Sequence, residues 1–267
     1  MCTVSLLSLS DHGSAPPSGP APGTRPVPAG AFRLVTNRDE QHHRPAALHP
    51  LHRTFGPRTA LMPVDPVSDG TWVAVNDAGL ALTLLNYKRP ELPPVARPPS
   101  VSRGRVIPDL LHHATVRDAA DALADFDPGS TPPFRLLLVD ASHQAVVRAD
   151  GRRLVTDLQP RRAEPLLLTS SGLGDHLVEP PREALFRAAA PATAADQNAF
   201  HRHQWPDRTP VSVQMHRPDA RTISRTAVTV RPGRITLAYT PIGFDGAQGP
   251  TTSLSLSPLP DPAEAAV

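Results

Sequence analysis

TWVAVNDAGLALTLLN (residues 71–86) is the stretch of sequence that decides the fold. Two short apolar runs, rich in Val, Leu and Thr, flank the turn residues Asp77-Ala78-Gly79. Antiparallel strands joined by a tight turn have this pattern. The stretch therefore predicts a β-hairpin.

The same pattern predicts strands on both sides of this hairpin. It recurs at 134–149 (FRLLLVDASHQAVVRA) and 222–240 (TISRTAVTVRPGRITLAYT), and single strands are expected at 2–10, 31–37 and 152–158. Helical patterns lie between them, at 105–114, 116–126, 180–190 and 194–203. At 180–190 the two opening prolines fit a first helical turn. Hairpins separated by helices predict an α+β layered fold with mainly antiparallel sheets.

Proline is unusually frequent, with 34 in 267 residues, and it marks the irregular segments. Proline blocks both ladder hydrogen bonds and helix continuation, so 11–30 and 90–99 are predicted to be loops. The stretch 241–267 is predicted to be a disordered tail. No change in composition marks a boundary, so residues 1–240 are expected to form a single domain.

Charge and composition argue against nucleic-acid binding, membrane spanning and secretion. The net charge is +2, and no run of basic residues is interleaved with aromatics, so no nucleic-acid partner is expected. The apolar runs are too short to span a bilayer. The N-terminus lacks the basic region of a signal peptide, so a cytoplasmic protein is the expectation.

Cys2 is the single cysteine, which excludes an intrachain disulfide and a thiolate zinc cluster. It follows Met1 directly, and removal of that methionine would make Cys2 the first residue. Its thiol could then act as a nucleophile and its own α-amine, which titrates near ~7.7–8.0, as the base. The position alone favours an inert residue in a poorly ordered terminus over a catalytic one.

A series of short motifs follows Cys2 in order. They are NRDE (37–40), GTW (70–72), LNY (85–87), SRG (102–104), GLGDHLVEPPREALF (172–186) and RTISR (221–225). On these motifs the chain resembles the NRDE family, the bacterial and eukaryotic relatives of the transport-and-Golgi-organisation protein. The resemblance extends to about residue 240.

The family in turn resembles the N-terminal nucleophile hydrolases of the bile-acid amidase and acid amidase branch. This resemblance implies a four-layer αββα sandwich whose first strand presents Cys2. It also implies a cofactor-independent hydrolase that cleaves linear amide bonds of a small molecule through an acyl-thioester. The oligomeric state is not predicted.

The resemblance assigns catalytic roles to four residues. Cys2 is the nucleophile, Asp39 orients its amine, Asn86 donates to an oxyanion, and Arg225 stabilises negative charge. The expected substrate-binding residues are Asn37, Arg38, Trp72 and Ser170. Arg38 or Arg225, together with the nearby ammonium group, is also expected to lower the pKa of Cys2 and favour its thiolate.

Two departures from the amidase pattern support a second hypothesis. Thr36 stands where the amidases have an arginine, and Ser170 where they have a second asparagine. The alternative function is a non-catalytic binding or trafficking protein for haem or a lipid-like ligand. Eukaryotic relatives are associated with haem handling and lipid homeostasis.

The twelve histidines do not predict a metal site. Pro45 and Pro50 interrupt the cluster of His42, His43, His49 and His52, so no helical pair of ligands forms, and no HExxH motif is present. This cluster is the candidate contact in the haem-binding hypothesis.

Overall fold

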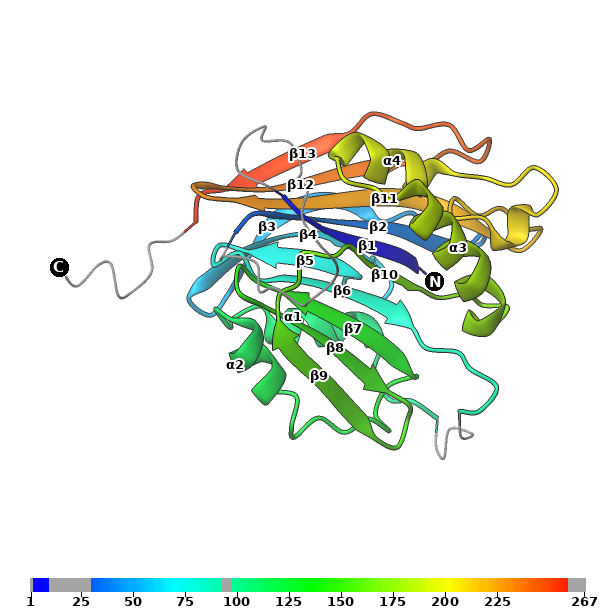
Figure 1. Cartoon of the computed structure of the whole chain (residues 1–267). Coiled ribbons are helices and arrows are strands. Elements are labelled where there is room, and N and C mark those ends of the chain that lie inside the picture. The colour runs from blue at the N-terminus through cyan, green and yellow to red at the C-terminus, as the bar shows by residue number, and fades with distance from the viewer. Residues whose placement is uncertain (1, 10–29, 93–97, 259–267) are drawn as a thin grey trace, which may run out of the picture.

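A computed structural model describes residues 2–9, 30–92 and 98–258 of the chain. Two antiparallel sheets lie face to face in these residues (Figure 1). The first sheet has six strands in the order β10 (Leu166–Thr169), β1 (Cys2–Ser8), β2 (Phe32–Gln41), β11 (Ala220–Arg231), β12 (Arg234–Pro241) and β13 (Thr252–Leu256).

The second sheet is a seven-stranded meander in which each strand pairs with the next along the chain. Its strands are β3 (Leu48–Phe55), β4 (Arg58–Val64), β5 (Val73–Asn76), β6 (Ala81–Asn86), β7 (Phe134–Val139), β8 (His143–Ala149) and β9 (Leu154–Pro160).

Alternation along the strands builds the core. In β1, Cys2, Val4 and Leu6 pack between the sheets against residues such as Val73 and Leu137 of the second sheet. Thr3, Ser5 and Leu7 are also buried, because the first sheet is covered on its other face as well. Buried area on both faces explains why β1 carries almost no exposed residue.

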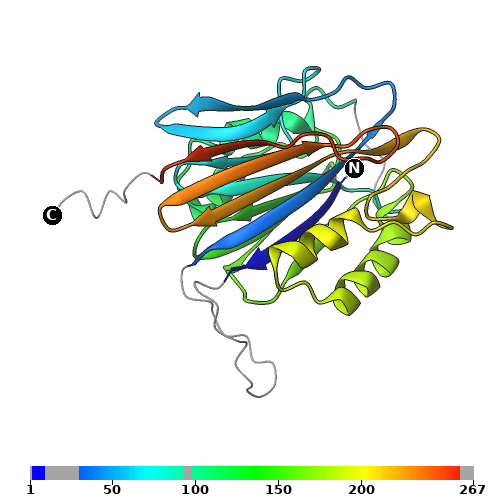
Figure 2. The same ribbon diagram turned by 90° about the horizontal axis from the view of Figure 1, so that it is seen from above.

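Helices cover both outer faces, which gives four layers in the order αββα (Figures 1 and 2). The first sheet contacts α3 (Asp175–Ala189) and α4 (Ala194–Arg202). The second sheet contacts α1 (Val106–Leu110) and α2 (Val116–Asp121), which share its outer hydrophobic cluster. Two short 3₁₀ turns, Arg103–Arg105 and Thr209–Val211, complete the elements.

The predicted α+β sandwich with antiparallel sheets is confirmed, and so are the three predicted hairpins. The prediction for 180–190 was wrong about where the helix begins. It starts at Asp175, so Pro180 and Pro181 lie inside it.

The prediction of a disordered tail over 241–267 was wrong for its first half, because β13 pairs with β12 there. Residues 259–267 and most of the predicted Pro-rich loops, at 10–29 and 93–97, lie outside the described residues.

Candidate active site

Cys2 is the first residue of β1 and is held by both neighbouring strands. It lies opposite Arg38 of β2, and on its other side Ser170 N donates to Cys2 O at 2.8 Å. Cys2 N donates to the Ser170 hydroxyl oxygen at 3.0 Å. The backbone of Cys2 is therefore fixed by hydrogen bonds that do not involve its side chain.

The Cys2 side chain lies between the two sheets, where it lines a cavity of about 110 Å³. Three other residues predicted from the sequence, Arg38, Trp72 and Asn86, line the same cavity. Asn86 is the last residue of β6, so the second sheet contributes an amide to the cavity. The structure thus brings these residues together from both sheets.

Arg38 is the cation next to the cysteine. Its guanidinium lies 4.1 Å from the centre of the Trp72 ring, and it forms ion pairs with Glu40 at 3.4 Å and Asp65 at 3.5 Å. Although Arg38 is only 4% exposed, its Nη1 has no hydrogen-bond partner among the described residues. A buried N–H group without a partner is costly and is available to a ligand oxygen.

Burial raises the pKa of the Cys2 thiol, the positive charge of the amino terminus lowers it, and the smaller effects of Asp39 and Arg38 respectively raise and lower it. Cys2 is 3% exposed, so desolvation of the thiolate outweighs the neighbouring cation. Arg38 thus lowers the pKa as expected but burial outweighs it, and the lowering expected from a free ammonium group on Cys2 stays a prediction. A neutral thiol in this position needs a base to remove its proton.

Asp39 lies on the opposite face of β2 from Arg38, because successive side chains alternate. Its carboxylate accepts a hydrogen bond from the Thr222 hydroxyl at 2.6 Å. Burial raises its pKa, and the positive charge of Arg182 lowers it. Asp39 is close enough to Cys2 to shift the pKa of the thiol, so it belongs to the surroundings of the cysteine without lining the cavity.

The structure does not bring Asn37 and Arg225 into the Cys2 cavity. They lie opposite each other in β2 and β11, on the face of the sheet turned toward the helices. Asn37 donates to His201 O at 2.8 Å and Val213 O at 3.0 Å, so it connects the sheet to the segments packed on it. Arg225 lines a second cavity.

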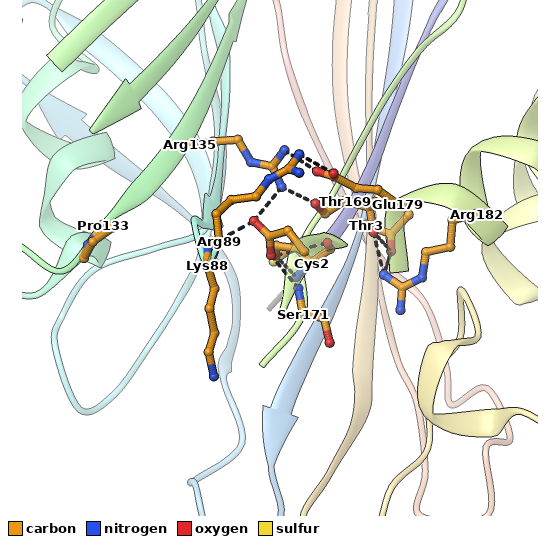
Figure 3. A network of polar contacts seen from close by, with 12 residues as sticks. Cys2, Thr3, Lys88, Arg89, Pro133, Arg135, Thr169, Ser171, Glu179 and Arg182 are labelled. Atoms are coloured by element: carbon orange, nitrogen blue, oxygen red, sulfur yellow. Dashed lines mark hydrogen bonds and ion pairs between the residues drawn. The ribbon is translucent and has the colours of Figure 1, made fainter. Parts of the chain in front are cut away.

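Two buried arginines form hydrogen bonds with the strands beside Cys2 (Figure 3). Arg182 of α3, which is 0% exposed, donates to the hydroxyls of Thr3 at 2.9 Å and Thr169 at 2.5 Å. Arg135 of β7 donates to the carbonyl oxygen of Thr169 and forms an ion pair with Glu179 at 3.0 Å. The two guanidinium groups reach the paired strands β1 and β10 from the helix layer and from the second sheet.

Sequence reasoning missed Glu40, Arg44, Asp65 and Arg103 as residues of the cavity. Burial lowers the pKa of Arg103, and Cys2 is the largest influence in the opposite direction, so the two side chains interact electrostatically. The SRG motif that contains Arg103 was the available signal, but nothing in its sequence indicates what it packs against.

The GTW and SRG motifs pack directly on each other. Thr71 N donates to Gly104 O at 2.9 Å, and a Cβ atom at Gly70 would lie 2.3 Å from the same oxygen. Only glycine fits at position 70, because any side chain would meet the backbone. This contact sets Trp72 and Arg103 beside the same cavity.

Among the described residues, no three His, Cys, Asp or Glu side chains are grouped in a way that could hold a metal ion. Nor does any helix in those ranges have the length and apolar character needed to cross a membrane.

The fold and the site define the class of the protein as an αββα sandwich of two antiparallel sheets, with a cysteine at the start of its first strand and a polar cavity beside that cysteine. The chain belongs to the family described as Transport and Golgi organisation 2, whose model matches residues 24–183. No curated protein matches the chain in sequence.

Two solved structures are similar to the chain at low identity. The C2A mutant of the conjugated bile acid hydrolase from Clostridium perfringens is 12% identical, with a TM-score of 0.48 over 95% of this chain and 92% of that one. The Caenorhabditis elegans ortholog of N-acylethanolamine-hydrolyzing acid amidase is 10% identical, with a TM-score of 0.47 over 85% of this chain and 92% of that one.

Proposed function

We propose that this protein is an N-terminal cysteine hydrolase that cleaves linear amide bonds in small polar substrates. The observation that carries the proposal is the position of Cys2, whose thiol lines a buried polar cavity while its backbone nitrogen is held by Ser170. Asn86 and Arg38 line the same cavity and supply N–H donors.

The mechanism begins once Met1 is removed, which turns the backbone nitrogen of Cys2 into an α-amine. That nitrogen already donates to Ser170, and the nearby negative charge of Asp39 makes the free amine a stronger base. Because the thiol is neutral, the amine accepts its proton as the sulfur attacks the substrate carbonyl.

The attack forms a C–S bond and places negative charge on the carbonyl oxygen. The amide of Asn86 and the unpartnered Nη1 of Arg38 are the donors available to that oxygen. The C–N bond then breaks, and the α-ammonium returns the proton to the leaving nitrogen. Water hydrolyses the acyl-thioester, which releases a carboxylic acid and restores the thiol.

The size and charge of the cavity favour a small polar substrate over haem or a long acyl chain. Its volume is about 110 Å³, below the ~300–1,000 Å³ of pockets that hold drug-sized ligands. Arg38, Arg44 and Arg103 line it together with Glu40 and Asp65. A charged lining of this kind binds polar groups and is costly to cover with a hydrocarbon.

Intact mass spectrometry and a panel of short acyl amides test the proposal. The purified protein is expected to lack Met1 and to hydrolyse at least one amide, and Cys2→Ser is expected to abolish turnover with an unchanged melting temperature. Asn86→Ala is expected to lower kcat by about 10²–10³, the usual effect of losing one oxyanion donor.

Retention of Met1 would contradict the mechanism. Saturable haem binding, followed in the Soret band, together with no turnover on the whole panel would contradict the proposal and favour the trafficking hypothesis. The Cys2→Ala variant serves as the blank for contaminating amidases.

A further inference from the structure

A second cavity, of about 270 Å³, lies on the helix-facing side of the first sheet. It is lined by Arg33 of β2, Arg225 of β11, and Asn198 and Arg202 of α4. Gln248, from the segment between β12 and β13, also lines it. The Cys2 cavity lies on the opposite face of the same sheet, so the two cavities are separate.

Three arginines line this second cavity and no carboxylate does. None of Arg33, Arg202 and Arg225 forms an ion pair with any acidic residue in the described part of the chain. This contrasts with Arg38 in the first cavity, which has two acidic partners. Buried cations are normally paired, so two buried arginines and an exposed third, all without counter-charges, favour the binding of an anion.

The two buried arginines are held by neutral amides. Arg33 donates to the side-chain oxygens of Gln197 at 2.6 Å and Asn198 at 2.8 Å. Arg225 donates through Nη2 to Gln248 at 2.5 Å. Both guanidinium groups are therefore fixed in position without being neutralised.

Arg225 retains an unused donor. It is 7% exposed, and its Nη1 is buried with no hydrogen-bond partner among the described residues. Burial and the nearby Arg225 lower the pKa of Arg33 to about 10, and burial and Arg202 lower the pKa of Arg225. The three cations repel one another, so bound negative charge would relieve an unfavourable arrangement.

We propose that this cavity binds the phosphate group of a small molecule through Arg33, Arg202 and Arg225. A guanidinium presents parallel N–H groups that match phosphate oxygens. A phosphate monoester carries a charge of about −1.5 to −2 at neutral pH, which suits three cations better than the single charge of a carboxylate. The volume accommodates the phosphate with a small organic group attached.

Isothermal titration calorimetry at constant ionic strength tests the proposal, with inorganic phosphate, glycerol 3-phosphate and acetate as probes. Phosphate or its monoester is expected to bind saturably, and acetate at least about tenfold more weakly. Sedimentation with vesicles that contain phosphatidic acid shows whether a lipid headgroup can be the source of the phosphate.

The variants are chosen to remain folded. Arg202→Gln removes an exposed cation at the end of α4, and Arg225→Gln retains a donor for Gln248. Each is expected to weaken phosphate binding about tenfold or more. Arg234→Gln, an exposed arginine of β12 that does not line the cavity, removes the same charge and is expected to bind as the wild type does.

Tighter binding of the monoester than of free phosphate, without vesicle binding, would assign a soluble ester as the ligand. Vesicle binding that soluble phosphate competes away would assign a lipid headgroup. The proposal would be overturned if phosphate does not bind saturably or if acetate binds as tightly as phosphate. It would also be overturned if Arg234→Gln weakens phosphate binding as much as the two cavity variants do. These outcomes are independent of amide hydrolysis, which uses the other cavity.

Discussion

Cys2 and Arg38 lie directly opposite each other in β1 and β2, yet the arginine does not dominate the chemistry of the thiol. Burial has the larger effect, and it raises the pKa of Cys2. A cysteine that stays protonated is protected from unspecific alkylation and oxidation, since the thiolate is the reactive form. Reaction with a bound substrate then depends on a local base.

The burial of Cys2, which is 3% exposed, limits access to the thiol and raises its pKa, so it predicts slow alkylation. At about pH 7, iodoacetamide is expected to label Cys2 more slowly than a cysteine in an unstructured peptide, whose pKa is near ~8.5. The rate should keep rising above the pH at which labelling of the peptide levels off. Mass spectrometry of timed samples measures both rates, and labelling faster than the peptide at neutral pH would contradict the prediction.

At the scale of elements, the long motif at 172–186 forms the start of α3 and the polar contacts that attach this helix to the sheet. Asp175, which is fully buried, accepts from Ser171 N at 3.0 Å and Lys88 N at 3.0 Å. Arg182 reaches β1 and β10 from the same helix. The motif therefore supports the strand that carries the nucleophile.

Loss of Arg182 is expected to be severely destabilising. Arg182→Met leaves the hydroxyl of Thr169 and the carbonyl of Ser212 without their buried donor. We expect a loss of about 3 kcal/mol or more in the free energy of unfolding. Urea denaturation measures it, and Arg187→Met, at an exposed position of the same helix, should change it by less than about 0.5 kcal/mol.

His201 of α4 is expected to make the protein sensitive to acid. Burial, followed by Arg225, Arg33 and Arg182, lowers its pKa well below the ordinary value. Below about pH 6.5 the unfolded chain binds a proton that the folded protein does not. Above about pH 6.5 the neutral His201 therefore does not reduce the free energy of unfolding. Below that pH the free energy of unfolding decreases as the pH falls toward the lowered pKa of His201.

Melting temperatures recorded from about pH 7.5 down to about pH 5 measure this loss. His201→Gln, whose side-chain oxygen can still accept from the Ser5 hydroxyl that lies 2.7 Å from His201 Nε2, should show a flatter profile. His176→Gln, at an exposed position, should follow the wild type. Parallel profiles for all three proteins would contradict the assignment to His201.

The elements that could be predicted from the sequence are those with regular apolar runs. The hairpins formed by β5–β6, β7–β8 and β11–β12 have them, whereas β3 (LHPLHRTF) is mostly exposed and lacks an apolar alternation. The start of α3 depends on the tertiary contacts of Asp175. No local pattern indicates such contacts, so the sequence predicts a start at the prolines instead.

Only part of the candidate site could be predicted from the sequence, and the reason is similar. The four residues of NRDE lie in one strand, so Arg38 and Glu40 face the Cys2 cavity while Asn37 and Asp39 face the helices. A motif shows that residues are neighbours in sequence but not which face each one occupies. Arg225 was assigned to the cysteine for the same reason, although it pairs with Asn37.

At the scale of the whole molecule, one sheet separates two cavities of different character. The Cys2 cavity has both acidic and basic residues, and the helix-side cavity has three arginines without acidic partners in the described residues. Their lining residues do not overlap. Substitutions that share no partners usually have additive effects, so we expect the two faces to respond independently.

This independence predicts different effects of two arginine substitutions on Cys2. Arg38 lowers the pKa of the thiol, so Arg38→Gln should raise that pKa and slow alkylation at neutral pH. Arg225→Gln should leave the alkylation rate within about twofold of wild type. The same timed mass spectrometry measures both, and an equal decrease in the two variants would show that Arg225 acts on the cysteine.

The internal position of β1 affects how this protein can be produced. Cys2 is the first residue of a strand paired on both sides, and its nitrogen is hydrogen-bonded inside the molecule. An affinity tag fused ahead of it would turn the proposed base into a peptide nitrogen and crowd the catalytic cavity. β13 is the edge strand at the other side of the same sheet, so a fusion placed after it leaves the nucleophile free.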